Sequence, residues 1–349
     1  MAQILRVLVI DDSAYVRKVV KEILSRSPFL EVVGIARDGR EALELVAQLQ
    51  PDVVTCDLIM PELDGVGFVR EQMKRRPIPI IIMSVASETA EAALTALDAG
   101  AVDFVQKPTA LASEKIFEVS SELIEKVKAA GNISLSRIAK APDAGVAAVA
   151  PARKTVGGSK LVDVVVIGVS TGGPQALKRL IPQLPADFSV PVAMVMHMPL
   201  GYTEMYAAKL NEISALNVRE ASEGDKLEPG LVLLAPAGRH LTFKKSRDGT
   251  VLTHLDARPF DSLHRPSVDV MFQSAAEVFT ARTLGVVMTG MGSDGKHGAA
   301  WIKSQGGLVF TEAESSCVVY GMPSVVVEAG LSDKSVALDG MAQAIMEVV

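Results

Sequence analysis

Short apolar runs alternate with amphipathic stretches along residues 1–128. Five runs are rich in β-branched residues and too short for helices, which predicts buried strands at residues 6–10, 31–35, 52–56, 78–83 and 102–105. Ser13 is a candidate N-cap, and the apolar residues after it recur at helical spacings, namely Val16, Val19, Val20, Ile23 and Leu24. Strands that alternate with helices predict an α/β fold with a doubly wound, five-stranded parallel sheet, which binds ligands at the carboxyl ends of its strands.

The pattern changes at residue 129, where the last predicted helix of this region ends. Residues 129–159 are rich in Ala, Gly, Pro and Ser, which predicts a flexible linker. Apolar runs resume at residues 162–167, 192–196, 231–234, 284–288 and 308–310. We therefore expect a first domain over residues 1–128, a linker over 129–159, and a second α/β domain over 160–349 that is large enough for its own core.

The composition narrows the classes of function. The chain has 35 Lys and Arg against 41 Asp and Glu, a net charge of −6, so it lacks the basic surface that nucleic acid requires. No run reaches the ~18 apolar residues of a membrane helix, and the N-terminus lacks a signal-peptide pattern, so we expect no membrane insertion. Cys56 and Cys317 lie far apart, which excludes a thiolate zinc site and favours the cytoplasm.

Charged side chains follow several strands of the first domain. Asp11 and Asp12 follow the first strand and Asp57 the third, and these strands are neighbours in a doubly wound sheet. Three converging carboxylates suit Mg²⁺, which keeps waters for a phosphate. Ser84 and Lys107 end the fourth and fifth strands and would bring a hydroxyl and an ammonium to the same edge. An Asp pair is often only a helix cap, but together these residues favour a phosphoryl site.

This region resembles response-regulator receiver domains along its whole length. The matching motifs are Asp11-Asp12-Ser13, residues 57–65, residues 100–104 and Lys107-Pro108. The resemblance implies that Asp57 accepts a phosphoryl group and that Mg²⁺ is held by Asp11, Asp12, Asp57 and the carbonyl oxygen of Ile59. It also implies that Ser84 and Lys107 sense the phosphoryl group.

A glycine-rich turn follows the first strand of the second domain. Ser170 lies between Gly168 and Gly172 before a helical stretch, which is typical of a nucleophile elbow with an oxyanion site at the helix N-terminus. A nucleotide-binding loop is an alternative, although the GxGxxG spacing is absent. A plain turn without chemistry is the third interpretation, and the turn alone leaves all three open.

A serine nucleophile needs a base, and the chain has five histidines. His197 follows the strand at 192–196, which we expect beside the elbow strand, and His240 is a weaker candidate. Asp294 follows the strand at 284–288 and could orient the base. The order Ser170, His197, Asp294 differs from that of α/β-hydrolases, in which the acid precedes the histidine. The remaining histidines are less favoured because they lie in polar or glycine-rich segments: His254, His264 and His297.

Nearly all of residues 160–349 resemble the catalytic domain of chemotaxis protein-glutamate methylesterases. The matching stretches are residues 167–174, 197–199, 235–240, 264–269, 284–295 and 316–323. The resemblance implies a Rossmann-like α/β domain with Ser170, His197 and Asp294 at the catalytic positions. The backbone N–H groups of Thr171 and Met291 are candidate oxyanion donors.

The resemblance also implies an activity and partners. The activity is hydrolysis of glutamate γ-methyl esters, with deamidation of glutamines as a second reaction, on methyl-accepting chemoreceptors. A chemotaxis histidine kinase would donate the phosphoryl group, Mg²⁺ would serve receiver phosphorylation, and ester hydrolysis would need no cofactor. Two other hypotheses remain: a receiver joined to an inactive interaction domain, and a nucleotide-dependent enzyme.

Overall fold

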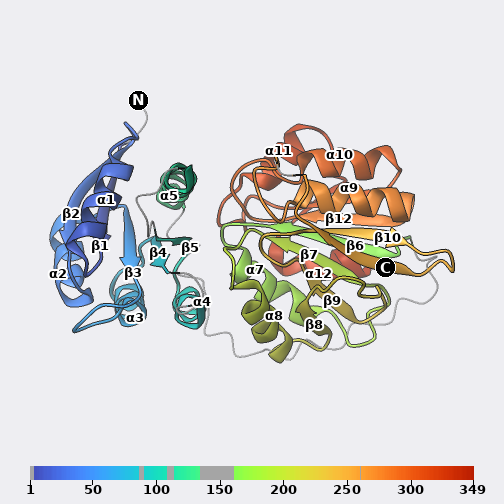
Figure 1. Ribbon diagram of the computed structural model, residues 1–349, viewed down its shortest axis with the longest axis horizontal. Helices are drawn as coiled ribbons and strands as arrows, with labels where there is room; N and C mark the ends of the chain where they lie inside the picture. The colour runs from blue at the N-terminus through green and yellow to red at the C-terminus, as the bar shows by residue number, and fades with distance from the viewer. Residues whose placement is uncertain (1–3, 86–89, 108–113, 134–160, 260) are drawn as a thin grey trace. The chain divides into compact units, whose positions relative to one another are not determined.

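The computed structural model describes residues 4–85, 90–107, 114–133, 161–259 and 261–349, with the side chains of 114–119 not described (Figure 1). The chain divides into two compact units, Met1–Asp143 and Ala144–Val349. The predicted linker falls largely on residues 134–160, outside the described residues, so its boundaries stay a prediction. No helix in the described part of the chain is long and apolar enough to cross a lipid bilayer.

The first unit is built on a parallel sheet in the order β2-β1-β3-β4-β5. Its strands are β1 (Leu5–Ile10), β2 (Leu30–Ala36), β3 (Val53–Asp57), β4 (Ile80–Ser84) and β5 (Asp103–Gln106). Its helices are α1 (Ala14–Leu24), α2 (Gly39–Leu49), α3 (Gly65–Arg75), α4 (Ala90–Asp98) and α5 (Glu114–Gly131). Helices α1 and α5 pack together, and α2, α3 and α4 pack in succession. The predicted doubly wound α/β sheet is confirmed.

The local sequence explains where these elements start. The Ser13 side chain accepts a hydrogen bond from the N–H of Val16, so the predicted N-cap of α1 is confirmed. Asp38 and Asp64 cap α2 and α3 in the same way. Every residue of β3 and β4 is buried, as expected for central strands covered on both faces.

The second unit has a parallel sheet of seven described strands in the order β14-β13-β12-β6-β7-β9-β8. These strands are β6 (Val164–Val169), β7 (Val192–Met196), β8 (Asn217–Glu220), β9 (Leu231–Leu234), β12 (Thr283–Val287), β13 (Leu308–Glu312) and β14 (Lys334–Val336). An antiparallel pair, β10 (His240–Lys245) and β11 (Val251–Asp256), forms a separate hairpin. The apolar runs predicted β6, β7, β9, β12 and β13, whereas the more polar β8, β10, β11 and β14 were not predicted.

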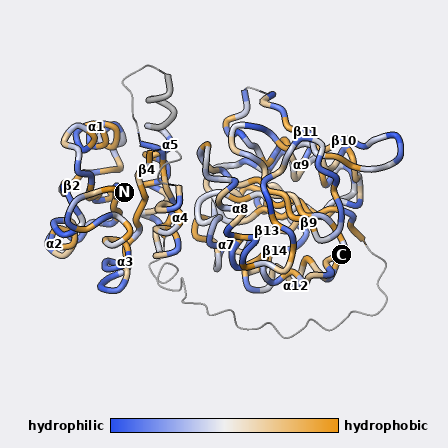
Figure 2. Tube along the Cα trace, turned by 60° about the horizontal axis from the view of Figure 1, so that its bottom comes forward, coloured by the Kyte–Doolittle hydropathy of each residue, from blue (hydrophilic) through white to orange (hydrophobic). Residues whose placement is uncertain are grey.

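Helices cover both faces of this second sheet. Figure 1 shows α9, α10 and α11 on one side and α7 and α8 on the other, and α12 packs against α7. The α-helices are α7 (Gly173–Leu180), α8 (Thr203–Glu212), α9 (Val268–Phe279), α10 (Lys296–Ser304), α11 (Met322–Glu328) and α12 (Leu338–Met346). Two short 3₁₀ helices are η1 (Ile181–Gln183) and η2 (Thr280–Arg282). Apolar residues follow the central strands (Figure 2).

Two glycines of α3 provide a matched test of close packing around Asp57. A Cβ on Gly65 would lie 2.1 Å from the carbonyl oxygen of Asp57, whereas a Cβ on Gly67 would meet side-chain atoms of Leu63 and Asp64 that can shift. We expect Gly65→Ala to lower the free energy of unfolding of the first unit by ~1–3 kcal/mol, and Gly67→Ala to lower it by less than Gly65→Ala. Hydrogen exchange of the β1 and β3 amides in the full chain would measure both. Equal losses of protection would contradict the expectation.

Candidate functional site

The charged residues predicted for the first unit lie together at the carboxyl ends of its strands. Carboxylate oxygens of Asp11, Asp12 and Asp57 lie within 4.8 Å of one another, because β1 and β3 are adjacent. Lys107 Nζ lies 2.8 Å from Asp11 Oδ2 and 2.7 Å from Asp57 Oδ1. This set of oxygens suits a divalent cation, and the ammonium lies where it can contact an anion bound to Asp57.

Burial and pairing act in opposite directions on these charges. Burial raises the pKa of Asp57 above its usual range, although the hydrogen bond and charge of Lys107 oppose that rise. Burial alone would lower the pKa of Lys107, but its hydrogen bonds to Asp11 and Asp57 outweigh burial and raise it. Lys107 therefore stays a cation that offsets part of the negative charge.

The other predicted residues of this unit lie around the same edge. Ser84 is buried at the end of β4, and its backbone oxygen accepts a 2.8 Å hydrogen bond from the N–H of Lys107. Its hydroxyl donates to the carbonyl oxygen of Val85 at 3.3 Å. Ile59 follows Asp57 by two residues and is 66% exposed, between the buried Leu58 and Met60.

In the second unit, the sheet order brings the predicted nucleophile and base together. Strand β6 lies between β7 and β12, and Val169 pairs with Met196 across β6 and β7. Ser170 and His197 are the next residues along these two strands, and the N–H of His197 donates to the carbonyl oxygen of Val169 at 3.3 Å. The expectation that these strands are neighbours is confirmed.

The turn that carries Ser170 is held by the segment after β12. The N–H of Ser170 donates to the carbonyl oxygen of Thr289 at 3.0 Å, and the Thr289 hydroxyl donates to the carbonyl oxygen of Thr171 at 2.9 Å. A Cβ on Gly290 would lie 2.8 Å from Ser170 Cβ, so only glycine permits this approach. Gly172 has a φ of 79°, a left-handed conformation that favours glycine. The backbone of Ser170, which follows β6, is thereby held by the segment that follows β12.

The candidate base and acid are hydrogen-bonded. His197 Nε2 lies 2.8 Å from Asp294 Oδ2, and both side chains are at least nine-tenths buried. His197 Nδ1 is also buried and has no hydrogen-bond partner among the described residues. Because an ionised Asp294 can only accept, Nε2 carries the proton and Nδ1 presents its lone pair. Nδ1 is thus the nitrogen that can take a proton.

Asp294 lies at the N-terminus of α9 and accepts several further hydrogen bonds. Its donors are the N–H groups of Val268 at 2.7 Å and Asp269 at 2.9 Å, and the Ser267 hydroxyl at 2.9 Å. Burial alone would raise the pKa of Asp294, but the bond from His197 and those from the helix N–H groups hold it well below its usual range. The carboxylate therefore stays ionised and oriented.

Asp269 caps the N-terminus of the neighbouring helix α10 in a similar way. Its Oδ1 accepts hydrogen bonds from the N–H groups of Gly295 at 2.9 Å and Gly298 at 2.7 Å, at the start of α10. Each of the two packed helices is therefore capped by an aspartate from the other's N-terminal region. Burial raises the pKa of Asp269, against the hydrogen bond from Gly298. This reciprocal cap fixes the loop that carries Asp294.

The candidate oxyanion donors flank the serine. Thr171 is buried and directly precedes Gly172, the N-cap of α7. Met291 directly follows Gly290, which packs against Ser170. Thr171 is thus the chain neighbour of Ser170, and Met291 is the chain neighbour of a residue that packs against Ser170.

Comparisons with known proteins agree with this geometry. The CheB methylesterase family matches residues 165–345, and the response regulator receiver domain family matches residues 7–118. The chain belongs to the CheB methylesterase family. The resemblance inferred from the sequence is confirmed for both parts of the chain.

Relatives in this family match along the whole chain. A Myxococcus xanthus protein named protein-glutamate methylesterase/protein-glutamine glutaminase 5 is 49% identical over 339 residues, covering 97% of this chain and 96% of that protein. A protein of the same name, without the number, from Symbiobacterium thermophilum is 45% identical over 355 residues, covering 99% and 97%. The crystal structure of the Thermotoga maritima CheB methylesterase catalytic domain matches with 40% identity and a TM-score of 0.53, covering 54% of this chain and 99% of that one.

The other histidines of this CheB family member differ sharply in environment. His240, the weaker candidate base, is fully buried, and both of its ring nitrogens are engaged, by the carbonyl oxygen of Pro259 and the N–H of Ser267. His254, on β11 of the hairpin, pairs with Glu223 in the segment after β8. His264, which the sequence did not favour, stacks on the ring of His197 with centroids 3.9 Å apart. The sequence did not predict this stack, because a contact between rings 67 positions apart leaves no local pattern.

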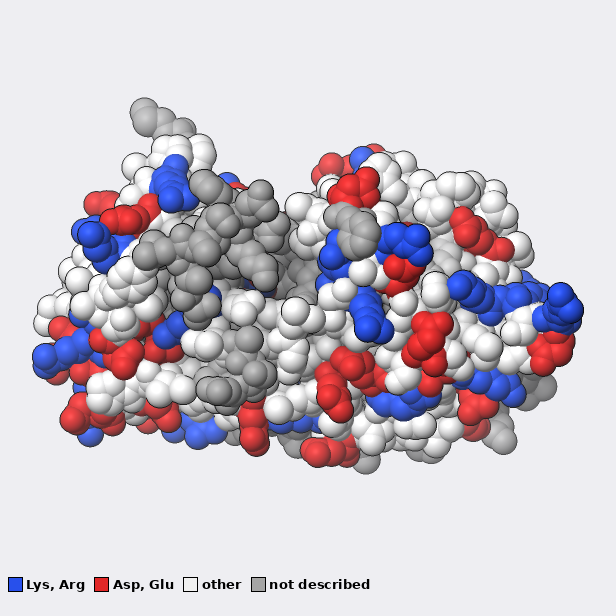
Figure 3. Space-filling model, viewed as in Figure 1, with Lys and Arg blue, Asp and Glu red and all other residues white. Residues whose placement is uncertain are grey.

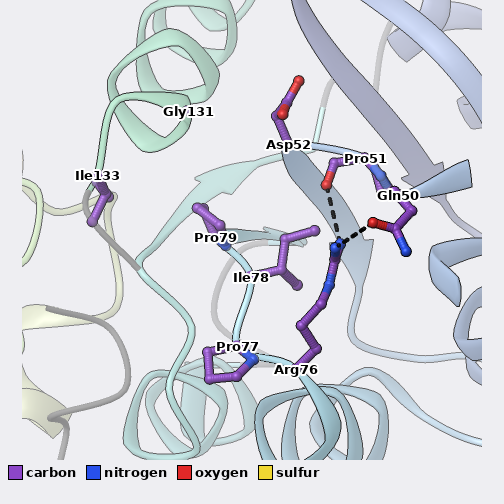
Figure 4. Close-up of a pocket in the computed structure, with 9 residues that line it drawn as sticks. All are labelled: Gln50, Pro51, Asp52, Arg76, Pro77, Ile78, Pro79, Gly131 and Ile133. Carbon is purple, nitrogen blue, oxygen red and sulfur yellow. Dashed lines mark hydrogen bonds between the residues drawn. The ribbon is translucent and has the colours of Figure 1, made fainter. Parts of the chain in front are cut away.

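Two pockets and the surface charge complete the description. A cavity of about 290 Å³ lies beside Asp294 and is lined in part by His264 and Ser267. A cavity of about 330 Å³ lies at the amino ends of β3 and β4, opposite the edge with Asp57, where Arg76 donates to Gln50 (Figure 4). Lys and Arg are interspersed with Asp and Glu on the face in Figure 3, without a broad basic patch.

The buried His240 predicts a pH dependence of stability. Burial lowers the pKa of His240, so the unfolded chain binds its proton at a higher pH than the folded chain does. Stability from the neutral ring is complete above about pH 6.5 and is lost as pH falls toward the lowered folded-state pKa. We expect His240→Gln, which cannot titrate, to reduce the loss of unfolding free energy between about pH 7.5 and about pH 5.5.

Fluorescence of Trp301 in α10, the single tryptophan of the chain, reports unfolding of the second unit in denaturant. Wild type and variant would be compared at both pH values. The same pH slope in both proteins would show that His240 does not contribute.

Proposed function

We propose that this chain is a phosphorylation-regulated protein-glutamate methylesterase that also deamidates glutamines, acting on chemoreceptors in chemotaxis adaptation. The observation that carries the proposal is the grouping of Ser170, His197 and Asp294 at the carboxyl ends of β6, β7 and β12, within a CheB methylesterase domain that follows a receiver domain. The names of the relatives support the same activity. We place the protein in the cytoplasm, because its proposed substrates are the cytoplasmic helices of the receptors.

The proposed reaction is acyl transfer through the serine. Ser170 Oγ attacks the ester carbonyl carbon of the glutamate side chain while His197 Nδ1 accepts the hydroxyl proton. His197 then gives this proton to the departing methoxy group, and methanol leaves a glutamyl-serine ester. Water attacks this ester by the same route in reverse and frees the glutamate carboxylate. With a glutamine substrate, ammonia takes the place of methanol.

The fixed charges around the site support this chemistry. Asp294 stays ionised and stabilises the His197 imidazolium, because its pKa is held low by several hydrogen bonds. The N–H groups of Thr171 and Met291 would donate to the carbonyl oxygen as it becomes an oxyanion. No residue of this scheme requires a cofactor.

The first unit would regulate this activity through phosphorylation. Asp57 would accept a phosphoryl group from a chemotaxis histidine kinase. Mg²⁺, held by Asp11, Asp12, Asp57 and the Ile59 carbonyl, would neutralise phosphoryl oxygens when bound. Ser84 and Lys107 would move to contact the phosphoryl group, and Lys107 would exchange its ion pair with Asp57 for the new anion.

The catalytic assignment predicts a graded loss of activity. Ser170→Ala and His197→Ala are each expected to lose roughly 10⁶-fold in kcat for methanol release from a methylated receptor fragment, and Asp294→Asn roughly 10⁴-fold. The acid variant loses less because Asp294 orients the base without taking its proton. The three residues act as a unit, so double variants should be no worse than Ser170→Ala.

His254→Ala is the matched control, because His254 lies on β11 outside this group and pairs with Glu223. It should keep the activity of the wild type. Near-normal turnover by Ser170→Ala would refute the serine mechanism, and a silent Asp294→Asn would refute the assignment of the acid.

The regulatory assignment predicts a loss of response. Asp57→Asn cannot form the acyl phosphate, so its esterase rate should stay at the unphosphorylated level when a small phosphodonor and Mg²⁺ are added. The wild type should become faster under the same conditions, and removal of Mg²⁺ with a chelator should abolish the change. Stimulation of Asp57→Asn by the phosphodonor would place the acceptor elsewhere.

A further inference from the structure

The rings of His197 and His264 lie almost parallel, with centroids 3.9 Å apart and an angle of 18° between their planes. We propose that His264 is a positioning residue that fixes the plane of the His197 ring, and thereby the direction of its Nδ1 lone pair. The inference rests on the proposed function, because it concerns the base of that reaction. It adds a role for a residue that lies outside the triad.

A single hydrogen bond cannot fix the plane of an imidazole ring. The bond from Nε2 to Asp294 Oδ2 fixes the position of one ring atom, but Nε2 lies close to the line of the Cβ–Cγ bond, so the ring can still turn about that bond with little movement of Nε2. Nδ1 makes no hydrogen bond with any described residue, so no second bond stops the rotation. A flat ring in contact with one face does stop it, because turning would drive His197 into His264.

The segment that carries His264 is itself held in place on both sides. The Ser262 hydroxyl donates to the carbonyl oxygen of His264 at 2.9 Å, and the N–H of Gly238 donates to the carbonyl oxygen of Arg265 at 3.0 Å. The N–H of Ser267 then donates to the buried His240 at 3.2 Å. These contacts make His264 a firm support for the ring that it touches.

The segment that carries His264 also binds Asp294, the candidate acid. The Ser267 hydroxyl donates to Asp294 Oδ1 at 2.9 Å, three residues after His264. The acid and the stacking ring are therefore held by one short stretch of chain, which sets both the position and the plane of His197. Proton transfer from Ser170 needs this alignment, because hydrogen bonds weaken steeply when donor and acceptor directions diverge.

The test compares a flat and a non-flat replacement in the full chain. His264→Phe keeps a ring against His197, whereas His264→Leu keeps apolar volume without a plane. We expect kcat for methanol release to fall at least tenfold in His264→Leu and to stay within about threefold of wild type in His264→Phe, with KM within about twofold in both. His254→Leu, which changes a histidine outside the group, should behave as wild type.

A spectroscopic measurement tests the ring independently of turnover. The ¹⁵N signals of the His197 ring should be sharp in wild type and His264→Phe, and broadened by exchange in His264→Leu and in a second non-flat variant, His264→Gln. Full activity of His264→Leu, or an equal loss in the Phe and Leu variants, would overturn the inference. If the wild type itself released no methanol, the proposed function would fail while the ring signals still tested the stack.

Discussion

Parallel strands end at the same edge of a sheet, and both sites of this protein depend on that constraint. In the first unit, adjacent β1 and β3 bring Asp11 and Asp57 together, and β5 adds Lys107. In the second, β6 lies between β7 and β12, so residues far apart in the chain follow neighbouring strands. The backbone ladder, and not the loops alone, therefore sets which side chains can meet.

The two sites keep buried charge by different means. In the first unit, one ammonium ion-pairs with two carboxylates, an arrangement that the proposed phosphorylation of Asp57 would change. In the second, the Asp294 carboxylate is bound by backbone N–H groups at the N-terminus of α9 and by His197. Backbone donors cannot swing away, so this charge is suited to a fixed, preorganised role.

The reciprocal caps of α9 and α10 link stability to the site. Asp294 accepts hydrogen bonds from the start of α9, and Asp269 from the start of α10, so the two helices and the loop that carries the candidate acid are held as one structure. The same bonds that satisfy helix N–H groups orient the candidate acid. His264, stacked on His197, extends this support to the candidate base. The fold and the site thus share their polar contacts.

The sequence by itself determined the elements with strong apolar patterns, the two-part organisation and the polar residues that follow the strands. Periodicity is a local property, so β3 and β7 could be predicted, and so could the edge on which Ser170 and His197 lie. The hairpin of β10 and β11 could not be recognised from continuous apolar runs, because buried Leu241 and Phe243 alternate with more polar residues in β10, which packs against α9. Only the tertiary structure decided that His240 is a buried support, that His264 stacks on His197 and that Asp269 caps α10. Each of these depends on contacts between segments distant in sequence, and such contacts leave no periodic signal along the chain.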